Sequence, residues 1–427
     1  MQANPSNREK IMYLPDYYEF CCAVKTIAGH KALEEIPALL STMGALKPMI
    51  ITDRGVSGAG LVDTVVGAMA GKIALGPVAD DVPPDSDLKV VTRLASVFRE
   101  HRCDSIVAIG GGSVLDTAKA INILVSHGSD DLMAFTGANA LKKRLNPMIA
   151  VPTTAGTGSE VTIVSVIADH EKRRKMLFTS PFLLPDAAII DTRMTLTLPP
   201  HITASTGMDA VSHAVEAYTC LAKNPLSDAH AFEAIELIST HLLKTVKNPQ
   251  DREGRLALAT AATLAGIAFS NSMVGMVHTL GHSVGSVCHV PHGTCMAILL
   301  PYGLEYNMHR VEDRIAELLF PLAGDRVYAS TPPRERAKAV IALIRRMNQD
   351  LFDLTGGRHC TAFKQVLNGQ GRPAVCGLPD LEAIAQTALG DGSIFYSPED
   401  LDFDDCMLVL EAAWDGTPLD RSKIKKG

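Results

Sequence analysis

Five of the fourteen histidines lie in two short, mostly apolar segments in the second half of the chain. The segment TGMDAVSHAVEAY places Asp209 and His213 four residues apart, and VHTLGHSVGSVCHVPHG places His278 and His282 four apart, with two more histidines following. Residues four apart share one face of a helix. Imidazole and carboxylate groups together suit a first-row divalent metal ion. The spacing therefore predicts a metal site, although it does not decide which histidines are the ligands.

A lone histidine on a helix is more often a satisfied core or surface residue than a metal ligand. Two pairs at helical spacing, followed by a Pro-His-Gly turn at residues 291–293, favour the metal interpretation. A set of four protein groups that leaves one coordination position open is typical of a catalytic site rather than a structural one.

Two loops in the first half have the composition of nucleotide-binding loops. GGGSVLDTAKA, residues 110–120, follows a predicted strand and opens a helix, whose free N–H groups form an anion site. VPTTAGTGSEVT, residues 151–162, follows another predicted strand and is rich in hydroxyl groups. An ordinary strand–helix junction or a polar surface loop would explain either motif alone. Two such loops at strand ends of one sheet favour a nucleotide.

Asp53 ends the first strongly predicted strand. A carboxylate at this place in a dinucleotide fold bonds the ribose 2′-hydroxyl and disfavours a 2′-phosphate, which predicts NAD rather than NADP. The following Arg54 weakens that prediction because its side chain can reach a phosphate. A turn-forming aspartate is an equally good explanation of Asp53 taken alone.

The elements that must position these groups change character near residue 197. Before it, predicted strands lie at 49–53, 72–75, 105–109, 147–151, 161–167 and 187–190, and predicted helices at 61–69, 88–99 and 114–126. This alternation predicts a parallel sheet with helices on both faces. After it, helices are predicted at 231–246, 253–270, 276–288, 311–323 and 334–351, with a long loop at 355–378. We therefore expect an α/β domain over residues 1–197 and an all-helical domain over residues 198–427.

Composition excludes several classes of protein. The 427 residues, at about 150 per domain, allow two or three domains. Forty basic against forty-seven acidic residues and 5% aromatic residues argue against nucleic-acid binding. No apolar run approaches 18 residues, so we expect no membrane span. Nine scattered cysteines and the lack of a signal-peptide pattern predict reduced thiols and a cytoplasmic location.

In this order, the motifs resemble those of the iron-dependent (group III) alcohol dehydrogenases, from about Pro15 to Trp414. The chain is similar to members of the lactaldehyde reductase and 1,3-propanediol dehydrogenase type. The resemblance implies a Rossmann-like α/β N-terminal domain and an all-α C-terminal domain, together a dehydroquinate synthase-like fold, with the active site between them. It also implies an NAD-dependent alcohol dehydrogenase that interconverts small primary alcohols and aldehydes by hydride transfer, assembled as a homo-oligomer.

Carried over position by position, the family's metal ligands fall on Asp209, His213, His278 and His292. The resemblance favours Fe(II), with Zn(II) as the alternative. His282 matches a histidine beside the metal and the nicotinamide, where it would relay a proton, and Phe269 matches an aromatic residue at the substrate end. Cofactor contacts would fall on Asp53, Gly111, Gly112, Ser113, Asp116, Thr153, Thr154, Thr157, Thr162, Val166 and Lys175.

Two features depart from the family pattern. An asparagine often found before the helix at 88–99 is absent, and Pro84–Asp85 stands about there. This departure puts one ribose or adenosine contact in doubt. The loop at 355–378 also looks longer than in compact members, so it could cover an edge of the cleft or an oligomer contact.

Three alternative functions stay open at this point. A hydroxyacid–oxoacid transhydrogenase of the 4-hydroxybutyrate type uses the same architecture and retains its cofactor. A lyase of the dehydroquinate synthase type would need a basic phosphate cradle near the metal, whereas residues 269–301 contain no lysine or arginine. A non-catalytic oligomeric protein with a structural metal would not need two intact cofactor loops.

Overall fold

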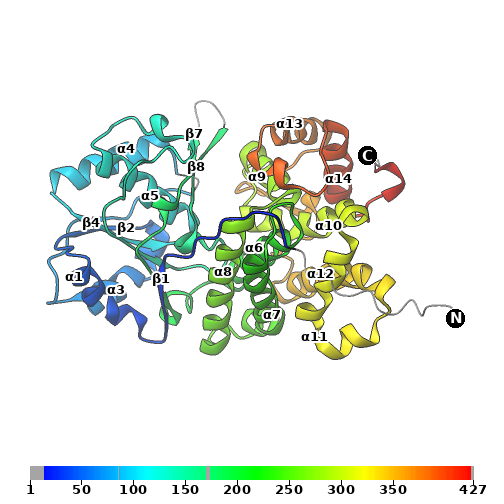
Figure 1. Ribbon diagram of the computed structural model, residues 1–427, viewed down its shortest axis with the longest axis horizontal. Helices are drawn as coiled ribbons and strands as arrows, with labels where there is room; N and C mark the ends of the chain where they lie inside the picture. Colours follow the sequence, from blue (N-terminus) through cyan, green and yellow to red (C-terminus); the bar gives the residue numbers. More distant parts are fainter. Residues whose placement is uncertain (1–13, 85, 170–173, 425–427) are drawn as a thin grey trace.

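The computed structural model describes residues 14–84, 86–169 and 174–424. Two halves of different architecture lie side by side (Figure 1). Every strand of the described chain lies before residue 192, and the elements after residue 199 are helices. The expected fold class, a parallel-sheet domain followed by a helical domain, is confirmed.

The main sheet of the first half has six parallel strands in the order β1-β9-β6-β4-β2-β3. The central strands are fully buried, as expected for a parallel sheet covered on both faces. Their bounds, in sheet order, are β1 Lys25–Gly29, β9 Ala187–Asp191, β6 Met148–Pro152, β4 Ser105–Gly110, β2 Pro48–Ile51 and β3 Val78–Ala79. A smaller sheet is formed by β5 (Gly137–Ala138), β8 (Arg174–Thr179) and β7 (Val164–Asp169).

Alternating side chains of the strands build two separate cores. Met49 and Ile51 of β2 face α4 (Leu88–Glu100) and α5 (Gly112–His127), whereas Ile50 faces α1 (Ile36–Thr42) and α3 (Leu61–Met69). The short helix α2 (Arg54–Gly58) follows β2 directly. Both nucleotide-type loops begin where β4 and β6 end, so they lie at the same edge of the sheet.

Two strand predictions in this half are wrong in detail. The segment 72–75 is a turn that begins with a left-handed Gly71, and the strand forms later, at β3. The expected strand at 161–167 begins only at Val164, because residues Ser159–Val161 wind into a 3-10 turn. Strands β1 and β8 were not predicted.

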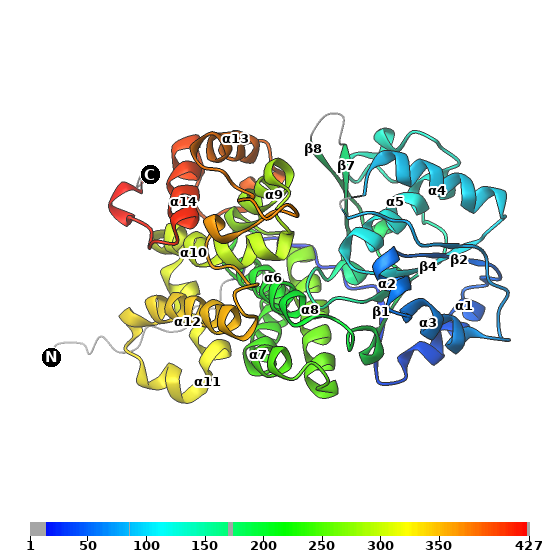
Figure 2. The ribbon, with the colours of Figure 1, turned by 180° about the vertical axis from the view of Figure 1, so that it is seen from behind.

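The second half is a helical assembly in which α6 and α8 lie toward the sheet domain and α11, α12 and α14 lie farther from it (Figure 2). Helix α6 is buried on nearly all sides over its second half, as expected for a central helix. The predicted helix at 276–288 is confirmed, whereas the one predicted at 311–323 is helical in type but is not continuous, because α10 ends at Glu317 and α11 begins at Leu319. The helices are α6 Pro200–Thr219, α7 Pro225–Lys247, α8 Arg252–Ser272, α9 Met276–Cys288, α10 His292–Glu317, α11 Leu319–Ser330, α12 Pro333–Leu354, α13 Leu378–Ala388 and α14 Phe403–Asp415.

No single helix within the described ranges is long and apolar enough to cross a membrane. Helices α8 and α9 reach the required length and composition only as a pair, and they meet at an angle of 104°.

The two halves approach each other closely at a pair of glycines. A Cβ atom placed on Gly158, in the loop after β6, would lie 2.5 Å from the Cα of Gly266 in α8. Gly158 also has a φ of +62°, which favours glycine. This contact sets the loop at 153–162 directly against the helical half.

Candidate active site

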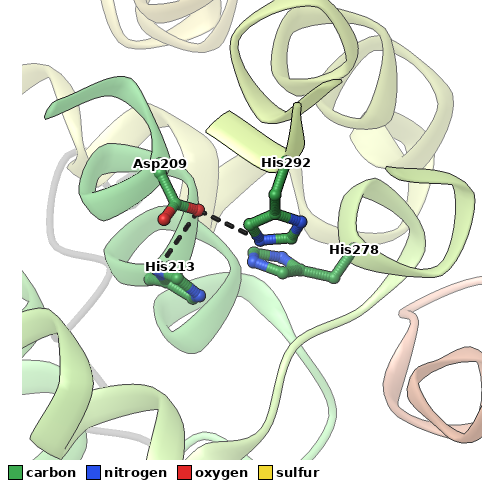
Figure 3. Close-up of side chains that lie close together, drawn as sticks. All are labelled: Asp209, His213, His278 and His292. Atoms are coloured by element: carbon green, nitrogen blue, oxygen red, sulfur yellow. Dashed lines mark ion pairs between the residues drawn. The ribbon is translucent and has the colours of Figure 1, made fainter. Parts of the chain in front are cut away.

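Four side chains from three helices of the second half meet at one point (Figure 3). Asp209 and His213 lie one turn apart on α6, His278 is on the first turn of α9, and His292 begins α10. One potential ligand atom from each residue lies within 4.8 Å of the others. The Asp209 Oδ1 atom is 3.6 Å from His213 Nδ1 and 3.3 Å from His292 Nε2. The structure therefore brings together all four residues predicted as metal ligands.

The chemistry of this cluster fits a divalent cation. Asp209 Oδ1, His213 Nδ1 and His278 Nε2 are buried and make no hydrogen bond within the part of the chain that the structure describes. Buried polar atoms without partners are rare because they lose their hydration without replacement. Burial lowers the pKa of His213 to about 3 and holds the pKa of His278 well below its usual value, so both imidazoles are neutral. Neutral imidazole is the form that binds a metal.

Glu216 is a functional residue that the sequence analysis missed. Its Oε2 atom lies 2.5 Å from His278 Nδ1, and its carboxylate also accepts the N–H groups of Val277 at 2.8 Å and His278 at 3.2 Å. With Nδ1–H donating to Glu216, His278 directs its free Nε2 toward the cluster. Burial raises the pKa of Glu216 to about 7, and the backbone N–H groups act in the opposite direction. The spacing Asp209, His213, Glu216 along one helix face could have revealed it.

His282 and Phe269, which the family resemblance puts beside the metal and at the substrate end, contact the rings of this cluster. The ring of Phe269 stacks on that of His213, with centroids 4.2 Å apart, and His282 stacks on His292 at 5.4 Å. His282 Nδ1 lies 2.9 Å from Asp391 Oδ2. Burial acts to raise the pKa of Asp391, but the charge and hydrogen bond of His282 leave that pKa below its usual value. Asp391 is far away in sequence, and no motif pointed to it.

The glycine-rich turn borders a cavity of about 840 Å³ on the side of the sheet domain. No side chain caps the N-terminus of α5, so its first amides are free to bind an anion. A Cβ on Gly112 would lie 2.8 Å from Thr157 Cγ2, so the two loops touch where that glycine stands. Asp53 borders the same cavity, and its Oδ1 caps α2 by accepting the N–H of Val56 at 2.9 Å.

A second cavity, of about 240 Å³, extends this space toward the histidines. Gly112 and Ser113 border both cavities, and His213, His278 and His292 line the second. Every residue predicted to contact a cofactor lines one cavity or the other: Asp53, Gly111, Gly112, Ser113, Asp116, Thr153, Thr154, Thr157, Thr162, Val166 and Lys175. Asp85, at the site of the missing asparagine, lies outside the described residues.

Asp116 and Thr162, two of the predicted cofactor contacts, also hold the second nucleotide-type loop in place through hydrogen bonds. Asp116 accepts the Ser159 hydroxyl at 2.6 Å and the N–H of Val166 at 3.0 Å. Thr162 accepts the buried ammonium of Lys119 at its hydroxyl, 3.0 Å away, and at its carbonyl, 2.9 Å away. These bonds tie the loop at 157–166 to α5. Lys119 is three residues after Asp116 in the same motif, but nothing in that motif distinguishes it from a surface lysine.

Comparisons with known proteins agree with this geometry. The family model described as iron-containing alcohol dehydrogenase matches residues 23–192, and that for the C-terminal part of the same family matches residues 203–414. The chain is 34% identical over 379 residues to an NAD-dependent methanol dehydrogenase from Bacillus methanolicus, covering 85% of this chain and 98% of that one. It is 31% identical to an NADPH-dependent butanol dehydrogenase from Clostridium saccharobutylicum, with 92% and 97% covered. A solved structure of 1,3-propanediol oxidoreductase aligns with a TM-score of 0.86 and 30% identity, covering 93% of this chain and all of that one.

Proposed function

The chain belongs to the iron-containing alcohol dehydrogenase family, and we propose that it interconverts small primary alcohols and aldehydes with NAD(H) as the hydride carrier. We assign the divalent metal, Fe(II) by family membership, to Asp209, His213, His278 and His292. In this proposal residues 1–197 hold the nucleotide and residues 198–427 hold the metal. The relative named NADPH-dependent leaves the choice of nucleotide to experiment.

One observation carries the proposal: the buried cluster and the glycine-rich turn line the same cavity. His278 and His292 of the helical half and Gly112, Ser113 and Thr157 of the sheet half all line this cavity. When bound, the metal ion supplies Lewis-acid chemistry at the alcohol oxygen, and the nicotinamide accepts or donates the hydride. A single cavity is what direct hydride transfer requires, because the alcohol carbon and the nicotinamide ring must be in contact.

The protein's own groups prepare the site for this reaction. Because the imidazoles of His213 and His278 are neutral and Asp209 is ionised, the ligand side chains bring one negative charge to a divalent ion. The remaining positive charge favours an alkoxide over an alcohol. Phe269, Met273 and Val274 line the cavity with apolar side chains, which suit a small alkyl chain and exclude water.

His282 is placed to carry the alcohol proton toward solvent. Asp391 receives Nδ1–H and so leaves Nε2 as the proton acceptor. If this role is right, His282→Ala at full metal occupancy lowers kcat about tenfold or more, with a changed pH profile. Unchanged kcat at every pH would remove His282 from the mechanism and leave it as support for the metal ligands.

The experiment for the whole proposal is NADH oxidation on a panel of short aldehydes, using apo protein reconstituted anaerobically with Fe(II), Zn(II) or nothing. We expect turnover that depends on the added metal. No turnover on any aldehyde, with metal and NAD both bound, would contradict the proposal. Exchange between 4-hydroxybutyrate and an oxoacid without added NAD would then identify the transhydrogenase alternative, which no described residue contact specifically favours.

A further inference from the structure

Met273 has a backbone conformation that is almost exclusive to glycine. It lies at the corner where α8 ends and α9 is about to begin, and the two helices meet there at 104°. Its φ is +66° and its ψ is −176°. His289, by contrast, has a positive φ of +56° with a ψ of +29°, the ordinary left-handed region. A side chain in the conformation of Met273 is strained, and such strain persists only where the surroundings enforce it.

The contacts around this corner show what enforces the conformation. The N–H of Met273 donates to the carbonyl of Phe269 at 2.7 Å, which completes the last turn of α8. The buried thiol of Cys220, at the end of α6, approaches the carbonyl of Ser272 at 2.8 Å and that of Met273 at 3.6 Å. The backbone is therefore fixed on both sides of the Met273 peptide group, by the helix that it ends and by a neighbouring helix.

Met273 lines the smaller cavity together with the predicted metal ligands His213, His278 and His292. Phe269, one helical turn earlier on α8, stacks on the ligand His213. Ser113 and Thr157, from the two nucleotide-type loops, line the same cavity. Met273 consequently borders the space next to the metal ligands, where the carbon chain of an alcohol must extend.

We propose that Met273 limits the length and branching of the alcohols that the enzyme accepts, and that the strained corner exists to place this side chain in the cavity. The inference rests on the proposed alcohol dehydrogenase function. A cavity of about 240 Å³ has little room to spare. A flexible thioether in its lining occupies the space that a branched or longer chain would need. A glycine would satisfy this backbone without strain and would leave that space open.

The test compares Met273→Gly with Met273→Ala in the metal-loaded enzyme. Both variants remove the side chain, so both should raise the ratio of kcat/KM for 3-methylbutan-1-ol to that for ethanol by about tenfold or more, with KM for NAD unchanged. Only alanine keeps the strain, so the Tm of Met273→Gly should exceed that of Met273→Ala, the reverse of the usual order. Met43, a half-buried methionine, does not line either cavity. Met43→Ala is therefore the control, and it should change neither the ratio of kcat/KM between the two alcohols nor the KM for NAD.

An unchanged alcohol ratio in both variants would overturn the inference, as would a shift in KM for NAD instead. A Tm order with alanine above glycine would contradict the strain.

A wild-type enzyme that turns over no alcohol would refute the proposed function. A second measurement, which needs no turnover, therefore distinguishes failure of the proposed function from failure of the inference about Met273. Calorimetry on the metal- and NADH-loaded protein compares the inert aldehyde analogues isovaleramide and acetamide. Met273→Gly should bind isovaleramide about tenfold more tightly relative to acetamide, and no change in that ratio, or no binding of either, would overturn the inference without reference to turnover.

Discussion

The nucleotide side of the cleft offers backbone amides beside its polar side chains, whereas the metal side is built from side chains alone. Gly111, Gly112 and the uncapped start of α5 present amides at the edge of the sheet. In the helical half, Asp209 and three histidines present single atoms from three separate helices. The first arrangement depends on how closely two loops can approach. The second depends on each side chain and on the contacts that orient it.

This difference sets the size of the effects that substitutions should have. Removing one ligand atom disables a metal site, whereas a backbone site loses affinity only when an added atom pushes the loops apart. Metal binding should therefore be most sensitive to substitutions that remove a ligand atom or its hydrogen-bond partner. Nucleotide binding should be most sensitive to substitutions that add atoms where the two loops touch.

The largest effect is expected from His278→Ala. The loss of one ligand should remove the metal and lower turnover on the order of 10³-fold or more, because Lewis-acid stabilisation is worth several kcal/mol. Metal content by mass spectrometry and the rate of NADH oxidation measure the two consequences. His289→Asn is the matched control, since this exposed residue on the same segment has no part in the cluster and asparagine accepts its positive φ. Full metal content in His278→Ala would contradict the assignment.

Glu216→Gln should have the next largest effect, through orientation rather than ligation. The variant keeps the shape of the side chain but loses the carboxylate that fixes the His278 tautomer, so metal affinity should fall roughly 10- to 100-fold. Competition with a chelator of known affinity measures this, and the Tm of the apo protein shows whether the fold is intact. Glu233→Gln, on the exposed face of α7, is the control. Affinity equal to that of the control would mean that Glu216 only caps α9.

Gly112→Ala tests the cofactor side. The added Cβ would lie 2.8 Å from Thr157 Cγ2, so the loops must separate. We expect KM for NAD to rise roughly tenfold, about 1.4 kcal/mol of binding, with metal content unchanged. Gly67→Ala is the control, since nothing lies within 4 Å of its Cβ position, and it should stabilise α3 by about 1 kcal/mol. If KM for NAD stayed constant in Gly112→Ala, close loop approach would not be what shapes the nucleotide site.

Asp53→Gly should have the smallest effect, a change of preference rather than a loss of activity. Removing the carboxylate removes its repulsion of a 2′-phosphate, so the ratio of kcat/KM for NADP to that for NAD should rise several-fold. Glycine replaces an N-cap residue at a cost of only a few tenths of a kcal/mol, so α2 should persist. Asp63→Asn, exposed on α3, is the control. No gain with NADP would exclude Asp53 from nucleotide selection.

The sequence predicted the parts of the fold in which local pattern and tertiary structure agree. The buried strand at 105–109 and the helix at 276–288 have strong periodicity, and both were found within a residue of the predicted bounds. The strand expected at 72–75 failed because a left-handed Gly71 turns the chain before the strand can form. Strand β8 was missed because its identity depends on antiparallel pairing with β7, which local pattern does not contain.

In the candidate site, too, the sequence predicted what residue types and spacing determine and missed what tertiary contacts determine. Asp209, His213, His278 and His292 carry their chemistry in their types and spacing, so the sequence could bring them forward as candidates. Glu216 and Asp391 act through contacts with histidines that are 62 and 109 residues away in sequence. Met273 matters because of its backbone angles. Neither long-range contacts nor dihedral angles can be deduced from one sequence, because both depend on how separate helices pack.

The central claim is that the metal cluster and the cofactor loops serve one reaction in one cavity. The most direct measurement is transfer of deuterium from a small alcohol deuterated at the carbinol carbon to NAD, followed by mass spectrometry of the product nucleotide. Metal-loaded protein should form deuterated NADH, and apo protein or the His278→Ala variant should form essentially none. Equal transfer by apo and metal-loaded protein, or no transfer with metal and NAD both bound, would contradict the account.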